Sequence, residues 1–250
     1  MIELTQIGST ATVVMDSPPV NAVNEDFLSR FEGALDEVER LGTASVLRIR
    51  SAQRVFCAGA DISRIDQFFS DKDGPRKMVV FVRKIHALFD RIERFPAATI
   101  AEISGTALGG GLELALSCDL RIAAHEAKLG LPEAKIGMIP GAGGTQRLSR
   151  ICGLGVANKI IVGCEVVDGR EAERLGIVSW SAPRADLEAR TDALVEHIAG
   201  LSRPALIAAK DCIAAGYDPL ADGFERELEA PLTLMKTKEA VERIGAFLEK

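Results

Sequence analysis

Strand-like and helix-like segments alternate along the first half of the chain, and this rhythm limits the fold more than any other feature. "ATVVMD" and "ASVLRIRS" are rich in strand-forming residues, and residues 24–41 between them repeat apolar side chains at helical spacing after the cap candidate Asn24. A second helical pattern over 79–95 precedes "AATIAEIS", and "DLRIAAHE" reads as a further strand. This order predicts an α/β domain with largely parallel strand pairing.

Helical patterns dominate from Ser149 onward, and we expect the strand-like "GIVSWSA" to be their one interruption. Residues 203–250 carry no strand signal. A chain of 250 residues is suited to one sizeable core with a small appendage. We therefore predict a core over residues 1–195 and a helical C-terminal subdomain over residues 196–250. No exact repeat is visible, although the early rhythm is compatible with a structural repeat.

Charge and composition argue against several classes of partner. A net charge of −6, with one Trp and one Tyr, disfavours nucleic acid. No apolar run approaches the roughly 20 residues that span a bilayer, and "MIELTQIGST" lacks the pattern of a secretory signal. We therefore expect a cytoplasmic protein without a membrane partner. The five cysteines form no C-x-x-C pair, so free buried thiols are expected and no metal site.

The glycine-rich stretches do not fit the common nucleotide-binding loops. A phosphate-binding P-loop requires a Gly-Lys pair, and the chain contains none. "GTALGGGLEL" follows a strand but lacks the spacing of a dinucleotide-binding loop. A G-x-S-x-G elbow is also missing, which disfavours a serine hydrolase.

The stretch "ALGGGLELALSCD" places Gly109, Gly110 and Gly111 between a strand and a helix. Such glycines allow a ligand to approach the backbone closely, and the first N–H groups of a helix have no partner within the helix. The simpler alternative, tight packing of the helix on the sheet, stays open for the cluster taken alone.

A second small-residue turn occurs in "CAGADIS", where Gly59 lies between Ala58 and Ala60. Two backbone N–H groups aimed at one carbonyl oxygen form an oxyanion hole, in which each donor stabilises the transition state by about 3–4 kcal/mol. By itself the stretch is also compatible with an ordinary turn before a helix. We expect Asp61 to cap that helix rather than to act as a catalyst.

Glu113 and Glu133 are carboxylates in largely apolar surroundings. An acidic residue in the first turn of a helix commonly complements the helix dipole, which is the simpler explanation for either one. A buried carboxyl group, however, has a raised pKa, and two such groups can divide acid and base work between them.

With these residues assembled, the chain resembles the crotonase family, specifically the enoyl-CoA hydratases. The resemblance rests on "PPVNAV", "FCAGADI", "ISGTALGGGLELALSCDLRIA", "LGLPEAKIGMIPGAGGTQRL" and "GREAERLGIV", from about residue 18 to residue 180. It implies a spiral of ββα units followed by C-terminal helices, assembled as a homotrimer or as a dimer of trimers, a homohexamer. It also implies an acyl-CoA thioester substrate, so that coenzyme A is part of the substrate, with no separate cofactor and no metal.

The resemblance further assigns roles. Ala60 and Gly110 match the donors to the thioester oxygen, and Glu113 and Glu133 match the family's two hydratase glutamates, here the base and the acid. The positions expected to contact substrate or its water are Ala58, Asp61, Ile62, Gly109 and Gly141. The chain departs from the family at residues 18–20 and at Ser63, where many relatives carry lysines that meet the CoA phosphates; Arg64 follows Ser63.

The implied reaction is hydration of a 2-enoyl-CoA to a 3-hydroxyacyl-CoA, as in fatty-acid β-oxidation. Alternatives within the family are isomerisation of the double bond and hydration of a branched or cyclic enoyl-CoA. A non-catalytic acyl-CoA-binding protein is the alternative from another class.

Overall fold

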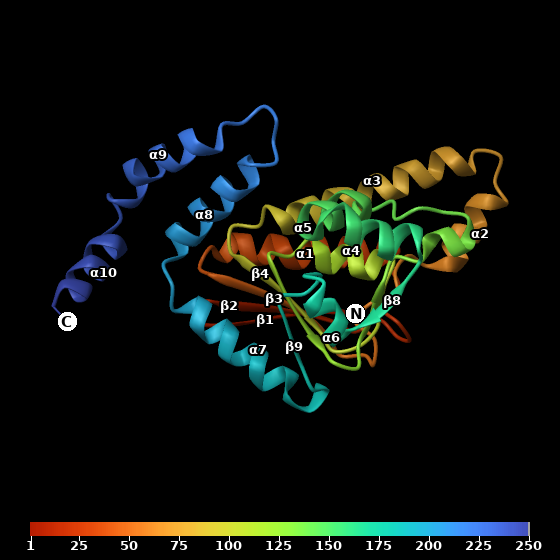
Figure 1. The fold of residues 1–250 in the computed structure, drawn as a ribbon, viewed down its shortest axis with the longest axis horizontal. Coiled ribbons are helices and arrows are strands. Elements are labelled where there is room, and N and C mark those ends of the chain that lie inside the picture. The colour runs from red at the N-terminus through yellow and green to blue at the C-terminus, as the bar shows by residue number, and fades with distance from the viewer. Residues whose placement is uncertain (250) are drawn as a thin grey trace.

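The computed structural model describes residues 1–249, which form two sheets surrounded by helices (Figure 1). The larger sheet has six strands, in the order β1 (Ile2–Ile7), β2 (Thr10–Met15), β3 (Val46–Ser51), β4 (Ala98–Ile103), β6 (Leu120–Ala124) and β9 (Trp180–Ala182). Only β1 and β2 pair antiparallel, and every later pair in this sheet is parallel. The predicted parallel α/β architecture is confirmed.

The smaller sheet contains β5 (Ala107–Leu108), β7 (Lys128–Gly130) and β8 (Val166–Asp168). A single bridge from Cys57 to Ala107 extends it by one more segment. Successive turns of the chain therefore place one strand in the larger sheet, then a short segment in the smaller sheet, and then a helix. This is the structural repeat with which the strand-helix rhythm is compatible.

Seven helices follow or cover these strands: α1 (Glu25–Leu41), α2 (Ile62–Phe69), α3 (Gly74–Glu93), α4 (Gly110–Leu116), α5 (Gly144–Ala157), α6 (Gly169–Arg174) and α7 (Arg184–Ala199). A 3₁₀ turn, η1, spans Glu133–Ile136, and a π-helical turn, η2, spans Asn158–Val162. Asn24 caps α1 as predicted, because its side chain accepts a hydrogen bond from the N–H of Phe27 at 3.0 Å.

The sequence patterns did not predict β1, β8 or the two short strands β5 and β7. Strand β1 lies at the edge of the larger sheet with both faces partly exposed, so its alternation of apolar residues is weak. Strand β8 has three residues and interrupts the region in which we expected helices and one strand. Helix α3 begins five residues before the expected position 79, because Pro75 belongs to its first turn instead of breaking it.

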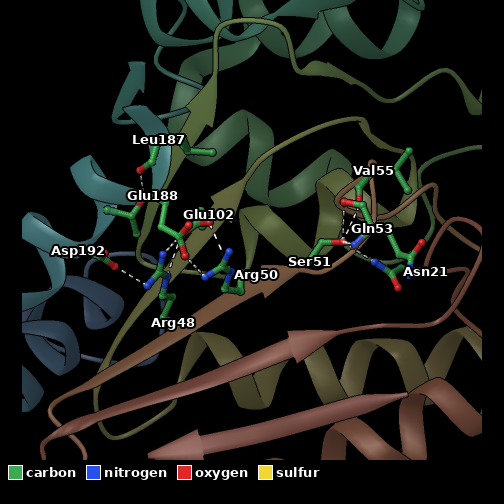
Figure 2. Close-up of polar contacts among 11 residues, drawn as sticks. Asn21, Arg48, Arg50, Ser51, Gln53, Val55, Glu102, Leu187, Glu188 and Asp192 are labelled. Atoms are coloured by element: carbon green, nitrogen blue, oxygen red, sulfur yellow. Dashed lines mark hydrogen bonds and ion pairs between the residues drawn. The ribbon is translucent and has the colours of Figure 1, made fainter. Parts of the chain in front are cut away.

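Arginine and carboxylate side chains tie α7 to the larger sheet (Figure 2). Arg48 on β3 donates to the buried Glu102 on β4 at 2.7 Å and to Asp192 on α7 at 2.7 Å. Arg50 lies 3.5 Å from Glu102 and also pairs with Glu188 on α7. A buried carboxylate is therefore shared by two cations that both reach the helix.

The C-terminal region is helical, as predicted: α8 (Arg203–Ala215), α9 (Gly223–Leu234) and α10 (Lys238–Leu248). Helices α9 and α10, drawn in blue, extend away from the two-sheet body (Figure 1). The predicted division at 195/196 lies inside α7, which packs on the larger sheet and continues to Ala199. Within residues 1–249, no helix is both long enough and apolar enough to cross a membrane.

All five cysteines are free, as expected. The expectation of burial holds only in part: Cys57 and Cys118 are buried, whereas Cys152, Cys164 and Cys212 are partly exposed.

Candidate active site

The segments of the smaller sheet end next to one another, and the candidate residues follow those ends. Cys57 bridges Ala107 in parallel, and β5 pairs in parallel with β7. Ala60 and Gly110 each lie three residues beyond the bridged pair, and Glu133 follows β7. Because parallel strands present their carboxyl ends at one edge of a sheet, the fold brings these three residues to the same place.

The backbone N–H groups of Ala60 and Gly110 lie side by side. A Cβ atom added to Gly110 would lie 3.4 Å from the nitrogen of Ala60, and one added to Gly59 would lie 3.0 Å from the nitrogen of Gly110. Gly110 is the first residue of α4, so its N–H has no acceptor within the helix. Within residues 1–249, neither N–H donates a hydrogen bond to another backbone group. Two adjacent backbone donors are thus free of backbone acceptors.

Gly109, Gly110 and Gly111 are required to be glycine, or are used as glycine, for different structural reasons. A Cβ atom on Gly111 would lie 1.9 Å from the carbonyl oxygen of Cys57, so this glycine permits close packing. Gly109 has a φ of +52°, which L-residues with side chains rarely adopt. The simpler packing explanation therefore applies to Gly111, while Gly110 presents a free N–H.

Asn21 holds the strand that leads to Ala60, and sequence reasoning did not single it out. Its buried side-chain amide donates to the carbonyl oxygen of Phe56 at 2.9 Å. It also donates to Ser51 at 2.8 Å (Figure 2). Its oxygen accepts from the N–H of Ser17 at 2.7 Å. The only sequence signal was a polar residue inside the apolar stretch "PVNAV", because both acceptors lie about 30 residues away.

Glu113 lies in the first turn of α4, in which every residue from Gly111 to Leu116 is buried. Its Oε1 accepts hydrogen bonds from the N–H groups of Ala142 and Gly144, both at 2.8 Å. Burial raises the pKa of Glu113 to about 7, even though the N–H of Gly144 opposes the rise, and the charge of Glu133 adds to it. Near neutral pH both ionisation states are therefore accessible.

Glu133 begins η1 and is partly buried. Burial raises the pKa of this carboxyl group as well. Its Oε2 is buried without a hydrogen-bond partner, and a Cβ atom on Gly109 would lie 2.9 Å from its Oε1. A buried, unpaired carboxyl oxygen beside the glycine turn is unusual in a folded protein and marks a group that can serve a ligand or water. The two carboxyl groups interact, so their titration belongs to the pair.

The remaining candidates lie around this centre. Asp61 caps α2, as predicted, because its side chain accepts from the N–H of Ser63 at 2.9 Å. Ile62, the first residue of α2, and Ala58 are exposed. The carbonyl oxygen of Gly141 lies 2.6 Å from Nε2 of His86. Contact of these residues with substrate stays a prediction.

Comparison with known proteins gives one consistent result. Residues 6–250 match the family model described as enoyl-CoA hydratase/isomerase. A probable enoyl-CoA hydratase of Bacillus subtilis (strain 168) is 36% identical, over 96% of this chain and 92% of its own length. The mitochondrial methylglutaconyl-CoA hydratase of Homo sapiens is 36% identical, over 92% of this chain and 68% of its own. The crystal structure of an enoyl-CoA hydratase from Bacillus anthracis superposes with a TM-score of 0.90 at 31% identity, covering 99% of this chain and 96% of that one.

Proposed function

Since the chain belongs to the enoyl-CoA hydratase/isomerase family, the crotonases, and has their fold, we propose that it adds water to a 2-enoyl-CoA. The product is a 3-hydroxyacyl-CoA. The observation that carries this proposal is the combination of the buried Glu113, the partly buried Glu133 and two free backbone donors. Hydration requires both a base and an acid, whereas electrophilic assistance comes from the donors.

In the proposed complex, the thioester oxygen accepts hydrogen bonds from the N–H groups of Ala60 and Gly110. These donors withdraw electron density from the conjugated double bond, so C3 becomes electrophilic. Negative charge then grows on the thioester oxygen, where fixed donors stabilise it more strongly than they stabilise the ground state.

The two carboxyl groups divide the proton transfers. Glu113 accepts two backbone hydrogen bonds, which favour its charged form, so it is the base. Glu133 has a buried oxygen without any donor, which favours its protonated form, so it is the acid. The oxygen of water bonds to C3 while a water proton passes to Glu113. Glu133 gives its proton to C2, and the enolate charge on the thioester oxygen disappears.

An assay with positional substrates tests this proposal. We expect crotonyl-CoA to yield 3-hydroxybutyryl-CoA, and we expect a 3-enoyl-CoA to react more slowly. Faster conversion of the 3-enoyl isomer would favour the isomerase alternative. Binding of acyl-CoA without turnover would favour a non-catalytic protein. Because some relatives are named methylglutaconyl-CoA hydratases, a branched substrate belongs in the same series.

A cationic cavity supports binding of the CoA phosphates despite the missing lysines. It has a volume of about 270 Å³ between α1, α2 and α3, and its basic side chains are Arg64, Arg76, Lys77 and Lys84, against one carboxylate, Glu25. We expect Arg76→Ala with Lys84→Ala to raise KM for an enoyl-CoA several-fold and to leave KM for an enoyl-pantetheine unchanged. An equal rise in KM for both substrates would show that the CoA phosphates do not bind in this cavity.

The exposed apolar side chains of the C-terminal region support assembly as a homotrimer or homohexamer. They lie just before α9, on it, between α9 and α10, and on α10, and they are Leu220, Phe224, Leu228, Leu232, Met235, Val241, Ile244, Phe247 and Leu248. A cytoplasmic location stays a prediction, and several relatives are named as mitochondrial.

A further inference from the structure

We infer that Arg147 and His86 are positioning residues for the base: they hold the turn 140–144 by its carbonyl groups, so that the amides of this turn fix the carboxylate of Glu113. The inference rests on the proposed function, in which Glu113 takes the proton from water. Neither side chain touches the two backbone donors or Glu133 through a hydrogen bond.

The peptide unit between Gly141 and Ala142 is held from both ends. Its carbonyl oxygen lies 2.6 Å from Nε2 of His86, and its N–H donates to Oε1 of Glu113 at 2.8 Å. The carbonyl and the N–H of a trans peptide point in opposite directions, so the three groups form one line. Hydrogen bonds in such a chain polarise one another. His86 on helix α3 is thus linked to the carboxylate of Glu113 through one peptide unit.

The carbonyl groups of the next two peptide units also accept hydrogen bonds. Nη1 of Arg147 donates to the carbonyl oxygen of Ala142 at 3.1 Å. The carbonyl oxygen of Gly143 accepts from the N–H of Arg147 at 2.8 Å, while the N–H of the same peptide unit, that of Gly144, donates to Glu113. Every carbonyl from residue 141 to residue 143 therefore has a donor.

This arrangement explains why the last two residues of "PGAGG" are glycines, although neither of them supplies an oxyanion donor. Gly143 has a φ of +104°, and a Cβ atom there would lie 2.2 Å from Nη1 of Arg147. A Cβ atom on Gly144 would lie 2.9 Å from Oε1 of Glu113. The turn is thus enclosed by the guanidinium on one side and by the carboxylate on the other.

Arg147 also brings a buried positive charge near the base. Its side chain is 6% exposed and donates to Glu93 at 2.9 Å and to Asp90 at 2.6 Å, both on α3. The charge of Arg147 lowers the pKa of Glu113, against burial and against the charge of Glu133, which raise it. The charged or titratable side chains around the turn and the base are His86, Asp90, Glu93, Glu133 and Arg147.

The test is the pH dependence of Arg147→Met, which removes the charge and the donors but keeps much of the volume. We expect the acid limb of kcat/KM to move up by about one pH unit, because an opposite charge at close range shifts a carboxyl pKa by this order. We expect kcat at pH 6 to fall about tenfold while KM stays within about twofold. Arg150→Met is the matched control, since Arg150 lies on the same helix but over Tyr217. It should leave the profile unchanged.

A folded Arg147→Met protein with the wild-type pH profile and rate would overturn the inference. If this variant does not fold, Arg147→Lys replaces it. The lysine keeps the charge but loses the forked donor, so we expect a wild-type acid limb with a lower kcat; an unchanged kcat would contradict us. His86→Leu should lower kcat about tenfold, and His86→Gln, which keeps an N–H donor, should restore most of it. Equal rates for the two would remove His86 from the mechanism.

Carboxyl ¹³C NMR separates this inference from the proposed function. The titration of Glu113, assigned with Glu113→Gln, should move upward in Arg147→Met even if the wild type hydrates no substrate offered. Absence of hydration in the wild type would end the proposed function. If the pKa of Glu113 is the same in Arg147→Met as in the wild type, Arg147 does not act on the base, whether or not the protein is a hydratase.

Discussion

Phenylalanine side chains have opposite surroundings in the two-sheet core and in the C-terminal helices. Phe31, Phe56 and Phe89 are fully buried in the core, whereas Phe224 on α9 is 81% exposed and Phe247 on α10 is 78% exposed. Apolar surface of this kind, repeated along two helices, is typical of an interface. The core therefore buries its own apolar surface, while the C-terminal helices leave theirs exposed, which is the surface that the proposed assembly would cover.

Ion pairs differ between the two regions in the same sense. Glu102 in the core is 3% exposed and faces both Arg48 and Arg50. On α10, Arg243 pairs with Glu239 one turn away, and their side chains are 47% and 35% exposed. A buried charge that loses its partner is costly, whereas a surface pair contributes little. Changes in the core should therefore affect stability and chemistry, and changes in the C-terminal helices should affect assembly.

The largest effect is expected from the two carboxyl groups. Glu113→Gln and Glu133→Gln should each lower kcat for crotonyl-CoA by roughly 10²–10⁴-fold, because each removes one proton transfer. Substrate affinity, measured by titration calorimetry, should change little, and the sedimentation coefficient should not change. Near-normal turnover by either variant would contradict the division of roles.

A smaller effect is expected on the stability of the core. Glu102→Gln should lower the free energy of unfolding by about 3 kcal/mol, since it leaves two arginines without their shared charge. Glu239→Gln on α10 is the matched change in an exposed pair, and denaturant titration should detect no difference there. An equal loss of unfolding free energy in both variants would contradict the difference between core and C-terminal ion pairs.

Glu113 should destabilise the core at alkaline pH. Its pKa is raised from an ordinary 4.5 to about 7 in the folded protein, so folding favours the protonated form. This stabilisation is complete below pH 4.5 and is lost as the pH rises through about 7. Glu113→Gln should therefore be more stable than wild type by about 3 kcal/mol at pH 8 and equal to it at pH 4. An advantage that does not depend on pH would have another cause.

The smallest effect on the core should come from the C-terminal helices. Replacing Phe224 and Phe247 with Ser removes two large apolar side chains from the proposed interface. Analytical ultracentrifugation should show a shift toward smaller species, and circular dichroism should show an intact core. As a control, Lys238→Ser changes an exposed polar position on α10. If the double variant forms species of the same mass as the wild type, Phe224 and Phe247 have no role in assembly.

Local signals were enough to predict much of the fold. The spacing of apolar residues and the cap Asn24 predicted α1, and buried strands such as β3 and β4 were found from their composition. Strands β1, β5, β7 and β8 were missed because an edge strand and strands of two or three residues carry little pattern. In α3, the residues taken for a break form the helix start.

The candidate site was only partly accessible from the residues themselves. The glycine cluster and the two glutamates stood out locally, but their convergence came from the family resemblance. The contacts of Asn21, and the amides that bind Glu113, join residues about 30 positions apart, and no local pattern encodes them. Arg147 was not singled out for the same reason, since its role depends on the folded turn.

The most direct test of the account is a crystal structure of Glu133→Gln with a 2-enoyl-CoA bound. The thioester oxygen should lie about 2.7–3.1 Å from the nitrogens of both Ala60 and Gly110. C3 should face Glu113 across one water molecule. A thioester oxygen bound elsewhere, with these two N–H groups donating to other acceptors, would contradict the central claim.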